Sequence, residues 1–283
     1  MILITGATGT AGPEMVKAVL DRGERVRVMA RNPEKAAALL GDEVEISRGD
    51  FTDEQSMVAA MEDVERALLL CPPALEQAAM ESRFIAAAKK AGVKHVVKLS
   101  VSAVDAKSDK LFLRSHGIVE EELKASGLAW TMLRPSFFMQ NLLVMAPMVK
   151  GGALYLPTGA GKGAFVDVRD LAAVAAAALS EKGHEGKAYE ITGPQALSYG
   201  EIAEILTRVL GKSVKHVDVP MEASKEAMLK IGLEPWRADA VNQLYQGQKD
   251  GIFSRVSNAV REVAKNEPTR MEQFVTEHRS AFT

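Results

Sequence analysis

The sequence predicts an α/β protein: a Rossmann-type doubly wound parallel sheet with a smaller C-terminal α/β lobe. Short apolar runs alternate with helical stretches up to residue 134, a glycine-rich turn follows the first run, and the alternation is less regular afterwards. Such alternation implies crossover connections, which are right-handed and place helices on both faces of a parallel sheet. We expect a Rossmann domain over residues 1–135 and a second lobe over residues 136–283, interleaved with the sheet edge.

The individual elements follow from periodicity and helix signals. Met15, Val16, Val19 and Leu20 recur at the spacing of one helix face, and Asn32 before a proline is a typical helix start. Later glycines end the expected helices. The expected strands lie at residues 2–5, 25–30, 44–48, 66–70, 95–99, 130–133, 189–192 and 214–219. The expected helices include residues 13–22, 53–61, 75–91, 117–126, 139–149, 168–180 and 199–210.

Composition limits the possible classes of partner. The 283 residues are 47% hydrophobic and carry a formal net charge of -2, without a long block of one sign, so we expect no nucleic-acid partner. No apolar run reaches the roughly 18 residues of a membrane helix, so no membrane partner is expected. A single cysteine and the absence of a basic leader favour the cytoplasm. We expect a monomer or homodimer without a metal site.

The first glycine-rich turn has the pattern Gly-x-x-Gly-x-x-Gly and lies between an apolar strand and a helix. Glycine permits the tight turn and lets the backbone approach a pyrophosphate, which the free N–H groups at the helix start then face. The pattern at this position predicts a dinucleotide site; a plain glycine-rich turn is the alternative. Its predicted binding residues are Gly6, Thr8, Gly9, Thr10, Ala11 and Gly12.

The end of the second strand indicates which dinucleotide binds. NAD-binding proteins place an acidic residue there, whereas this chain has Arg31, with Lys35 one turn into the next helix. A guanidinium matches a phosphate, so the pattern favours NADP(H) over NAD, unless Arg31 is only a solvated helix-start residue. Asp50, beside Phe51, either accepts from the adenine or caps the next helix.

Several motifs together resemble the NmrA-like, atypical short-chain dehydrogenase/reductases, over residues 1 to about 235. Within that family the chain is similar to NAD(P)H-dependent quinone oxidoreductases, triphenylmethane-dye reductases and azoreductases. The resemblance implies an oxidoreductase, whereas the regulators of the same family bind dinucleotide without turnover. The motifs are the turn over residues 5–12, Arg31–Lys35, Gly49-Asp50, Leu133–Pro135, Phe165–Asp170 and Gly186–Pro194.

The chain departs from ordinary short-chain dehydrogenases at the catalytic position. Their Tyr-x-x-x-Lys is absent, and the matching region has His116 and Glu120, four residues apart and therefore on one helix face. Ser100 matches the family's catalytic-strand serine. We predict His116, Ser100 and Glu120 as catalytic residues; His116 is a proton donor or, equally, a structural histidine.

The rest of the site is predicted from the strand ends. The nicotinamide should lie over the carboxyl ends of the fourth and fifth strands, beside Cys71, Pro72, Leu99 and Ser100. Cys71 has no basic neighbour in the sequence and is interpreted as a small apolar residue. Aromatic and methionine side chains after the sixth strand predict a flat apolar wall for a planar aromatic substrate, with core packing as the alternative. The predicted substrate residues are Phe137, Phe138, Met139, Asn141, Tyr155 and Trp236.

Two functions fit this pattern best, because the absent catalytic tyrosine speaks against a third, an epimerase-like sugar-nucleotide enzyme. One is an NADPH-dependent reductase that transfers hydride to a quinone, an azo dye or a triphenylmethane dye, electrophiles that need little acid assistance. The other is an NADP(H)-binding redox sensor without turnover, which the missing Tyr-x-x-x-Lys favours.

Overall fold

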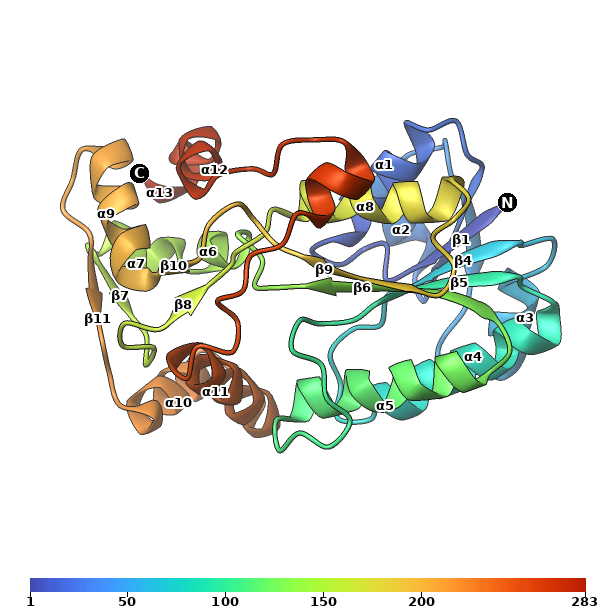
Figure 1. The fold of residues 1–283 in the computed structure, drawn as a ribbon, viewed down its shortest axis with the longest axis horizontal. Helices are drawn as coiled ribbons and strands as arrows, with labels where there is room; N and C mark the ends of the chain where they lie inside the picture. The colour runs from blue at the N-terminus through green and yellow to red at the C-terminus, as the bar shows by residue number, and fades with distance from the viewer.

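The computed structural model describes residues 1–283 and has a seven-stranded central sheet (Figure 1). All seven strands are parallel, in the order β3-β2-β1-β4-β5-β6-β9, and the order reverses between β1 and β4. The predicted doubly wound sheet is therefore confirmed. The strands are β1 (Ile2–Thr5), β2 (Val26–Ala30), β3 (Glu45–Arg48), β4 (Arg66–Leu69), β5 (His95–Leu99), β6 (Ala129–Pro135) and β9 (Lys187–Ile191).

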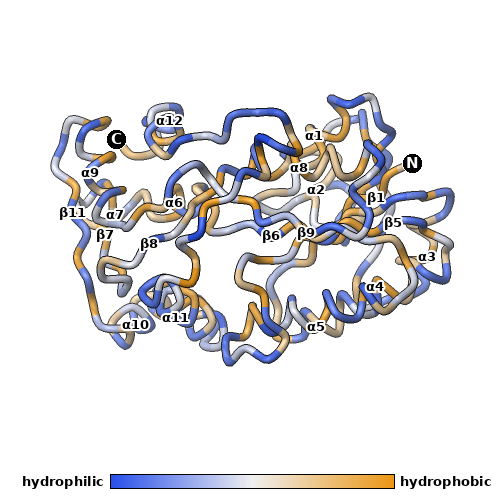
Figure 2. The backbone as a smooth tube through the Cα atoms, viewed as in Figure 1, coloured by the Kyte–Doolittle hydropathy of each residue, from blue (hydrophilic) through white to orange (hydrophobic).

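Helices cover both faces of this sheet. One face packs against α1 (Gly12–Leu20), α2 (Pro33–Leu40) and α8 (Val168–Ser180), the other against α3 (Glu54–Ala60), α4 (Gln77–Ala91) and α5 (Leu111–Ala125). Helix α8 consists almost entirely of alanine, valine and leucine, and its small side chains let it pack closely against α1 and the sheet. Hydrophobic residues gather along the strands and inner helix faces, whereas many peripheral turns are hydrophilic (Figure 2).

The second lobe lies beyond the carboxyl ends of the strands (Figure 1) and has its own apolar core. Two small sheets pair β7 with β11 and β8 with β10. Its strands are β7 (Ala153–Tyr155), β8 (Lys162–Gly163), β10 (Leu197–Ser198) and β11 (Lys215–Val217). Its helices are α6 (Asn141–Val144), α7 (Ala146–Lys150), α9 (Tyr199–Leu210), α10 (Met221–Lys230), α11 (Pro235–Lys249), α12 (Met271–Glu277) and α13 (Arg279–Phe282). The π-helix η1 (Val260–Ala264) packs instead in the core shared by α1 and α8.

Three element boundaries differ from the sequence prediction. The helix expected from Gly117 already begins at Leu111, which places His116 and Glu120 on the same helix. The helix expected over residues 139–149 is divided at Met145, because Pro147 has no N–H to continue the helical hydrogen bonds. The strand expected at residues 189–192 is β9, which begins at Lys187 and adds a parallel edge strand beside β6. None of the helices has both the length and the apolar character needed to cross a bilayer.

Candidate active site

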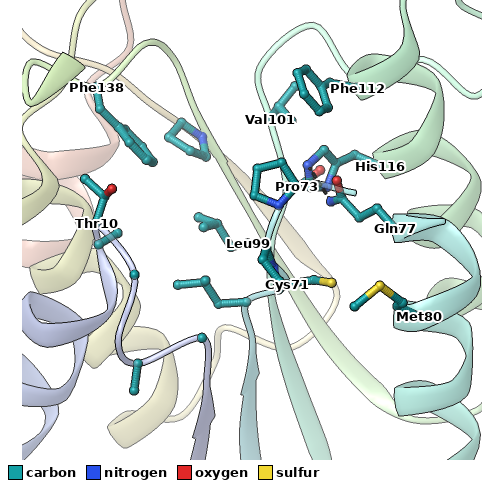
Figure 3. Close-up of a pocket in the computed structure, with 18 of the residues that line it drawn as sticks. Thr10, Cys71, Pro73, Gln77, Met80, Leu99, Val101, Phe112, His116 and Phe138 are labelled. Carbon is teal, nitrogen blue, oxygen red and sulfur yellow. Dashed lines mark hydrogen bonds between the residues drawn. The ribbon is translucent and has the colours of Figure 1, made fainter. Parts of the chain in front are cut away.

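A cavity of about 840 Å³ lies at the carboxyl ends of the central strands. This volume falls in the range of small-molecule and cofactor pockets. Thr10 and Phe138 lie on one side of the cavity, and His116, Gln77 and Met80 on the other, with Leu99 and Cys71 between them at its base (Figure 3). The cavity therefore collects residues from the glycine-rich turn, from the strand ends and from helices of both faces.

The glycine-rich turn has no room for side chains at two positions. Gly6 has a φ of +64°, and a Cβ there would lie 2.2 Å from Leu70 Cδ2 and 2.5 Å from the Leu70 carbonyl oxygen. A Cβ at Gly12 would lie 2.4 Å from the Gly6 carbonyl oxygen. Thr5 fastens the turn to β4, because its hydroxyl accepts from the Leu70 N–H at 2.9 Å and lies 3.0 Å from the Leu70 carbonyl oxygen.

The start of α1 has the features of an anion site. Its N-cap is Ala11, which has no side chain to accept from the first helical N–H groups. The residues Thr8 to Ala11 line the cavity directly before this helix. Free amides and the positive end of the helix dipole together favour a phosphate at this position. These features fit the pyrophosphate of a dinucleotide.

The basic residues of the second strand end line the same cavity. Arg31 is exposed and takes part in no ion pair, and Lys35 follows in the first turn of α2, which Asn32 caps with a 2.8 Å bond to the Lys35 N–H. No carboxylate stands at the tip of β2 to bind a bare ribose. The site thus has two cations available for a phosphate on that ribose.

Asp50 and Phe51 also line the cavity. The structure rules out one of the two roles considered for Asp50, that of capping the next helix. The N-cap of α3 is Asp53, which accepts from the N–H groups of Gln55 and Ser56, so Asp50 does not cap that helix. Hydrogen bonds from the Thr52 hydroxyl and N–H lower the pKa of Asp50. Asp50 is therefore an ionised hydrogen-bond acceptor at the cavity wall.

The base of the cavity is apolar. Leu70, Cys71, Pro72 and Leu99 line it at the ends of β4 and β5. Burial raises the pKa of the Cys71 thiol to about 12, so the side chain stays a neutral thiol at ordinary pH. This agrees with the interpretation of Cys71 as a small apolar residue rather than a redox group.

A fully buried ion pair stands behind the base of the cavity. The side chains of Lys98 on β5 and Glu81 on α4 are both 0% exposed, and their charged atoms are 2.5 Å apart. Lys98 Nζ also donates to the Leu99 carbonyl oxygen at 3.2 Å and contacts His116 Nδ1 at 3.0 Å. Burying two charges is costly unless each is paired and hydrogen-bonded, and here all three ammonium protons have an acceptor.

This arrangement fixes the state of His116. An ammonium only donates, so Nδ1 of His116 must accept from Lys98 and the ring proton lies on Nε2. The Gln77 amide nitrogen lies 3.1 Å from Nε2, but it is itself a donor to Glu81 and cannot accept that proton. Burial and the Lys98 charge hold the pKa of His116 well below its ordinary value. His116 is therefore a neutral imidazole whose Nδ1 accepts from Lys98, and its ring lines the cavity.

The other two predicted catalytic residues form a separate network. Ser100 lines the cavity and donates to Glu120 Oε1 at 2.7 Å, while Arg134 holds both oxygens of Glu120 at 2.9 and 2.6 Å. Burial alone would raise the pKa of Glu120, but the hydrogen bonds from Arg134 and Ser100 outweigh it and lower the pKa. Glu120 is thus an ionised residue that orients Ser100 from outside the cavity wall, and it does not bond to His116.

The far end of the cavity is aromatic. Phe137 and Phe138 line it, and the Phe137 ring meets Phe253 edge-on with 5.0 Å between centroids. Phe112, from the first turn of α5, lies near Val101 on the opposite side of the cavity from Phe138 (Figure 3). Ser136 also lines the cavity, and its buried hydroxyl has no hydrogen-bond partner within the protein. A flat ring system fits such a surface, with few polar groups to orient it.

Some predicted site residues lie outside the cavity. Met139 is 2% exposed in the core of the second lobe, Tyr155 is an exposed residue of β7, and the Trp236 indole donates to its neighbour Glu234. Gly12 packs beneath the turn. The remaining predicted cofactor and substrate residues, Asn141 included, line the cavity.

Sequence reasoning missed residues that join this wall from distant parts of the chain. Gln77 and Met80 come from α4, and Arg237, Leu244 and Phe253 come from α11 and the segment after it. Gln77 and Met80 lie in the first turns of the helix that follows β4, and the end of β4 was predicted at the cavity, so their position could have been predicted from the sequence. No motif in the sequence indicates that α11 reaches the site.

The whole chain resembles proteins that are already known. A model of the NmrA-like family matches residues 1–275. The chain is 36% identical to an NAD(P)H azoreductase of Xenophilus azovorans, over 100% of this chain and 99% of that protein. The structure of an Escherichia coli NADPH-dependent quinone oxidoreductase complexed with NADPH superposes with a TM-score of 0.91 at 30% identity, over 99% and 100% of the chains. The Citrobacter sp. triphenylmethane reductase complexed with NADP(H) has a TM-score of 0.89 at 26% identity, over 98% and 99%.

Proposed function

Because the chain belongs to the NmrA-like family, we propose that it is an NADPH-dependent reductase that transfers hydride to a planar electrophile. The acceptor is a quinone, an azo dye or a triphenylmethane dye, the classes that name its relatives. The observation that carries the proposal is one continuous cavity, which joins a phosphate-binding turn and two free cations to an aromatic end. The strand ends between them leave room for a nicotinamide.

Different residues bind the pyrophosphate, the ribose phosphate and the adenine of NADPH. The backbone N–H groups of Thr8, Thr10 and Ala11 bind the pyrophosphate at the start of α1. Arg31 and Lys35 bind the phosphate on the adenosine ribose. Asp50 accepts a hydrogen bond from the adenine. When bound, NADPH supplies the hydride, and the protein supplies position and a dry surface.

The catalytic contribution of the chain is orientation more than acid catalysis. Ser100 is held by Glu120 and Arg134 at the end of β5, where its hydroxyl stands beside the nicotinamide region. His116 is neutral, so it holds the cavity wall as a hydrogen-bonded imidazole and does not deliver a proton as an imidazolium. The aromatic wall holds the flat acceptor, and its apolar surface excludes water from the transfer.

The proposal is tested by NADPH consumption with a panel of quinones, azo dyes and triphenylmethane dyes. We expect turnover with members of these classes and none with a simple aliphatic ketone, since a ketone needs the acid catalysis that the absent tyrosine would give. The same protein with NADH serves as the cofactor control. Tight NADPH binding without turnover of any panel member would contradict the reductase and favour a redox sensor.

A further inference from the structure

An arginine from the C-terminal part of the chain lines the aromatic end of the cavity. Arg237 lies in the first turn of α11, and Leu244, two turns further on the same helix face, lines the cavity with it. The other residues with charged side chains that line the cavity are Arg31, Lys35 and Asp50, which belong to the adenosine end. No carboxylate lines the aromatic end.

The protein does not neutralise this guanidinium. Arg237 is exposed and takes part in none of the ion pairs of the structure. Its two acidic neighbours are engaged elsewhere: Glu234, the N-cap of α11, accepts from the Trp236 indole at 3.0 Å, and Asp239 on the helix pairs with Lys225 at 2.5 Å. Arg237 is thus available to a ligand.

Helix α11 is fastened beside the cavity at two points. The Leu111 N–H donates to Gln243 Oε1 at 2.8 Å, which ties α11 to the first turn of α5. Gln248 is fully buried and donates to the Gly161 carbonyl oxygen at 3.1 Å. Arg237 is therefore carried on an element whose position relative to the aromatic wall is set by the fold.

We propose that Arg237 recognises an anionic substituent on the planar acceptor, so that the site prefers acidic aromatic electrophiles bearing a carboxylate, sulfonate or phosphate. This rests on the proposed reductase function and narrows its substrate class. The ring system lies against the phenylalanines of the far wall, and its charged edge is directed toward α11. A guanidinium forms two parallel hydrogen bonds with such an anion.

The test compares naphthoquinone with its sulfonate as acceptors for the NADPH-loaded protein. The measured quantity is the ratio of kcat/KM for the sulfonate to kcat/KM for the parent quinone. The two quinones differ in intrinsic reactivity, but this difference is the same for every variant and cancels when the ratios of two variants are compared. We expect Arg237→Gln to lower this ratio about 10- to 100-fold, the loss of one charge-assisted contact, and Arg237→Glu to lower it further. The ratio in the unmodified protein should fall as salt is added.

Arg270→Gln is the matched control, because Arg270 is exposed, belongs to no ion pair and lies outside the cavity. An equal kcat/KM ratio in Arg237→Gln and Arg270→Gln would overturn the proposal. A loss of NADPH affinity in Arg237→Gln as large as the fall in that ratio would overturn it as well. If neither quinone is reduced, the reductase function itself has failed. The Kd of naphthoquinone sulfonate for the NADP⁺-loaded protein then decides: weaker binding in Arg237→Gln alone supports the anion site, and equal binding overturns it.

Discussion

Individual charged side chains define the two ends of the cavity. Arg31 at the adenosine end belongs to no ion pair within the protein, so its guanidinium is free to bind a phosphate. Lys98, in contrast, has every proton engaged by Glu81, Leu99 and His116, so its charge acts on its neighbours only. An unpaired cation selects a ligand, whereas a paired one sets the protonation of a neighbouring group.

Arg31→Asp should weaken NADPH binding about 10- to 100-fold more than NADH binding. One charge-assisted contact to the ribose phosphate is lost, and a repulsion is added that NADH does not experience. Calorimetric titration with both cofactors measures the difference. Arg25→Asp is the control, because Arg25 is exposed at the opposite end of the same strand. Equal weakening of both cofactors would refute the assignment of Arg31.

Lys98→Met should raise the pKa of His116. Burial still opposes protonation, but the ammonium is gone and the Glu81 carboxylate is left without its cation, so the imidazole can take that role. Ring nitrogen NMR shifts of His116 followed from pH 5 to pH 8 should be constant in the unmodified protein and titrate in the variant. Lys98→Arg keeps a cation and serves as the control. A His116 ring that titrates identically in Lys98→Met and Lys98→Arg would show that Lys98 does not set its state.

At the level of elements, Glu120 joins three pieces of the fold. Glu120 lies on α5 and accepts hydrogen bonds from the Ser100 hydroxyl at the end of β5 and from two nitrogens of the Arg134 guanidinium on β6. The third guanidinium nitrogen pairs with Glu190 of β9 at 3.3 Å. This network ties a helix to the two last strands of the sheet. The free energy of unfolding of the protein should therefore depend on the ionisation of Glu120.

Glu120→Gln should lower the free energy of unfolding at pH 7 by roughly 3 kcal/mol, because a buried partner of Arg134 loses its charge. The folded-state pKa of Glu120 is lowered, so its contribution is complete above about pH 4.5 and is lost as the pH falls below that value through the lowered pKa. Urea unfolding between pH 3 and pH 7 should therefore show a weaker acid dependence in the variant. Glu121→Gln, on the exposed face of α5, should behave like the unmodified protein. Equal acid dependence in Glu120→Gln would exclude this role.

At the scale of the whole molecule, the sequence predicted the sheet and many of the residues that line the cavity, because both depend on local signals. The glycine-rich turn, Arg31 and the strand ends each follow from neighbours along the chain. Contacts between distant segments were not accessible in this way. The pairing of His116 with Lys98 depends on α4, β5 and α5 packing together, and α11 reaches the aromatic wall from more than a hundred residues beyond β6.

The seventh strand has a consequence for how the protein is assembled on the ribosome. β9 pairs with β6 along residues 187–191, and α8 fills the groove beside α1, yet both are synthesised after the beginning of the second lobe. A nascent chain that stops at residue 135 would leave the β6 edge without its neighbour and the α1 face uncovered. The predicted division at residue 135 therefore separates the cofactor-binding region from the substrate-binding region. We do not expect the two parts to fold as separately expressed fragments.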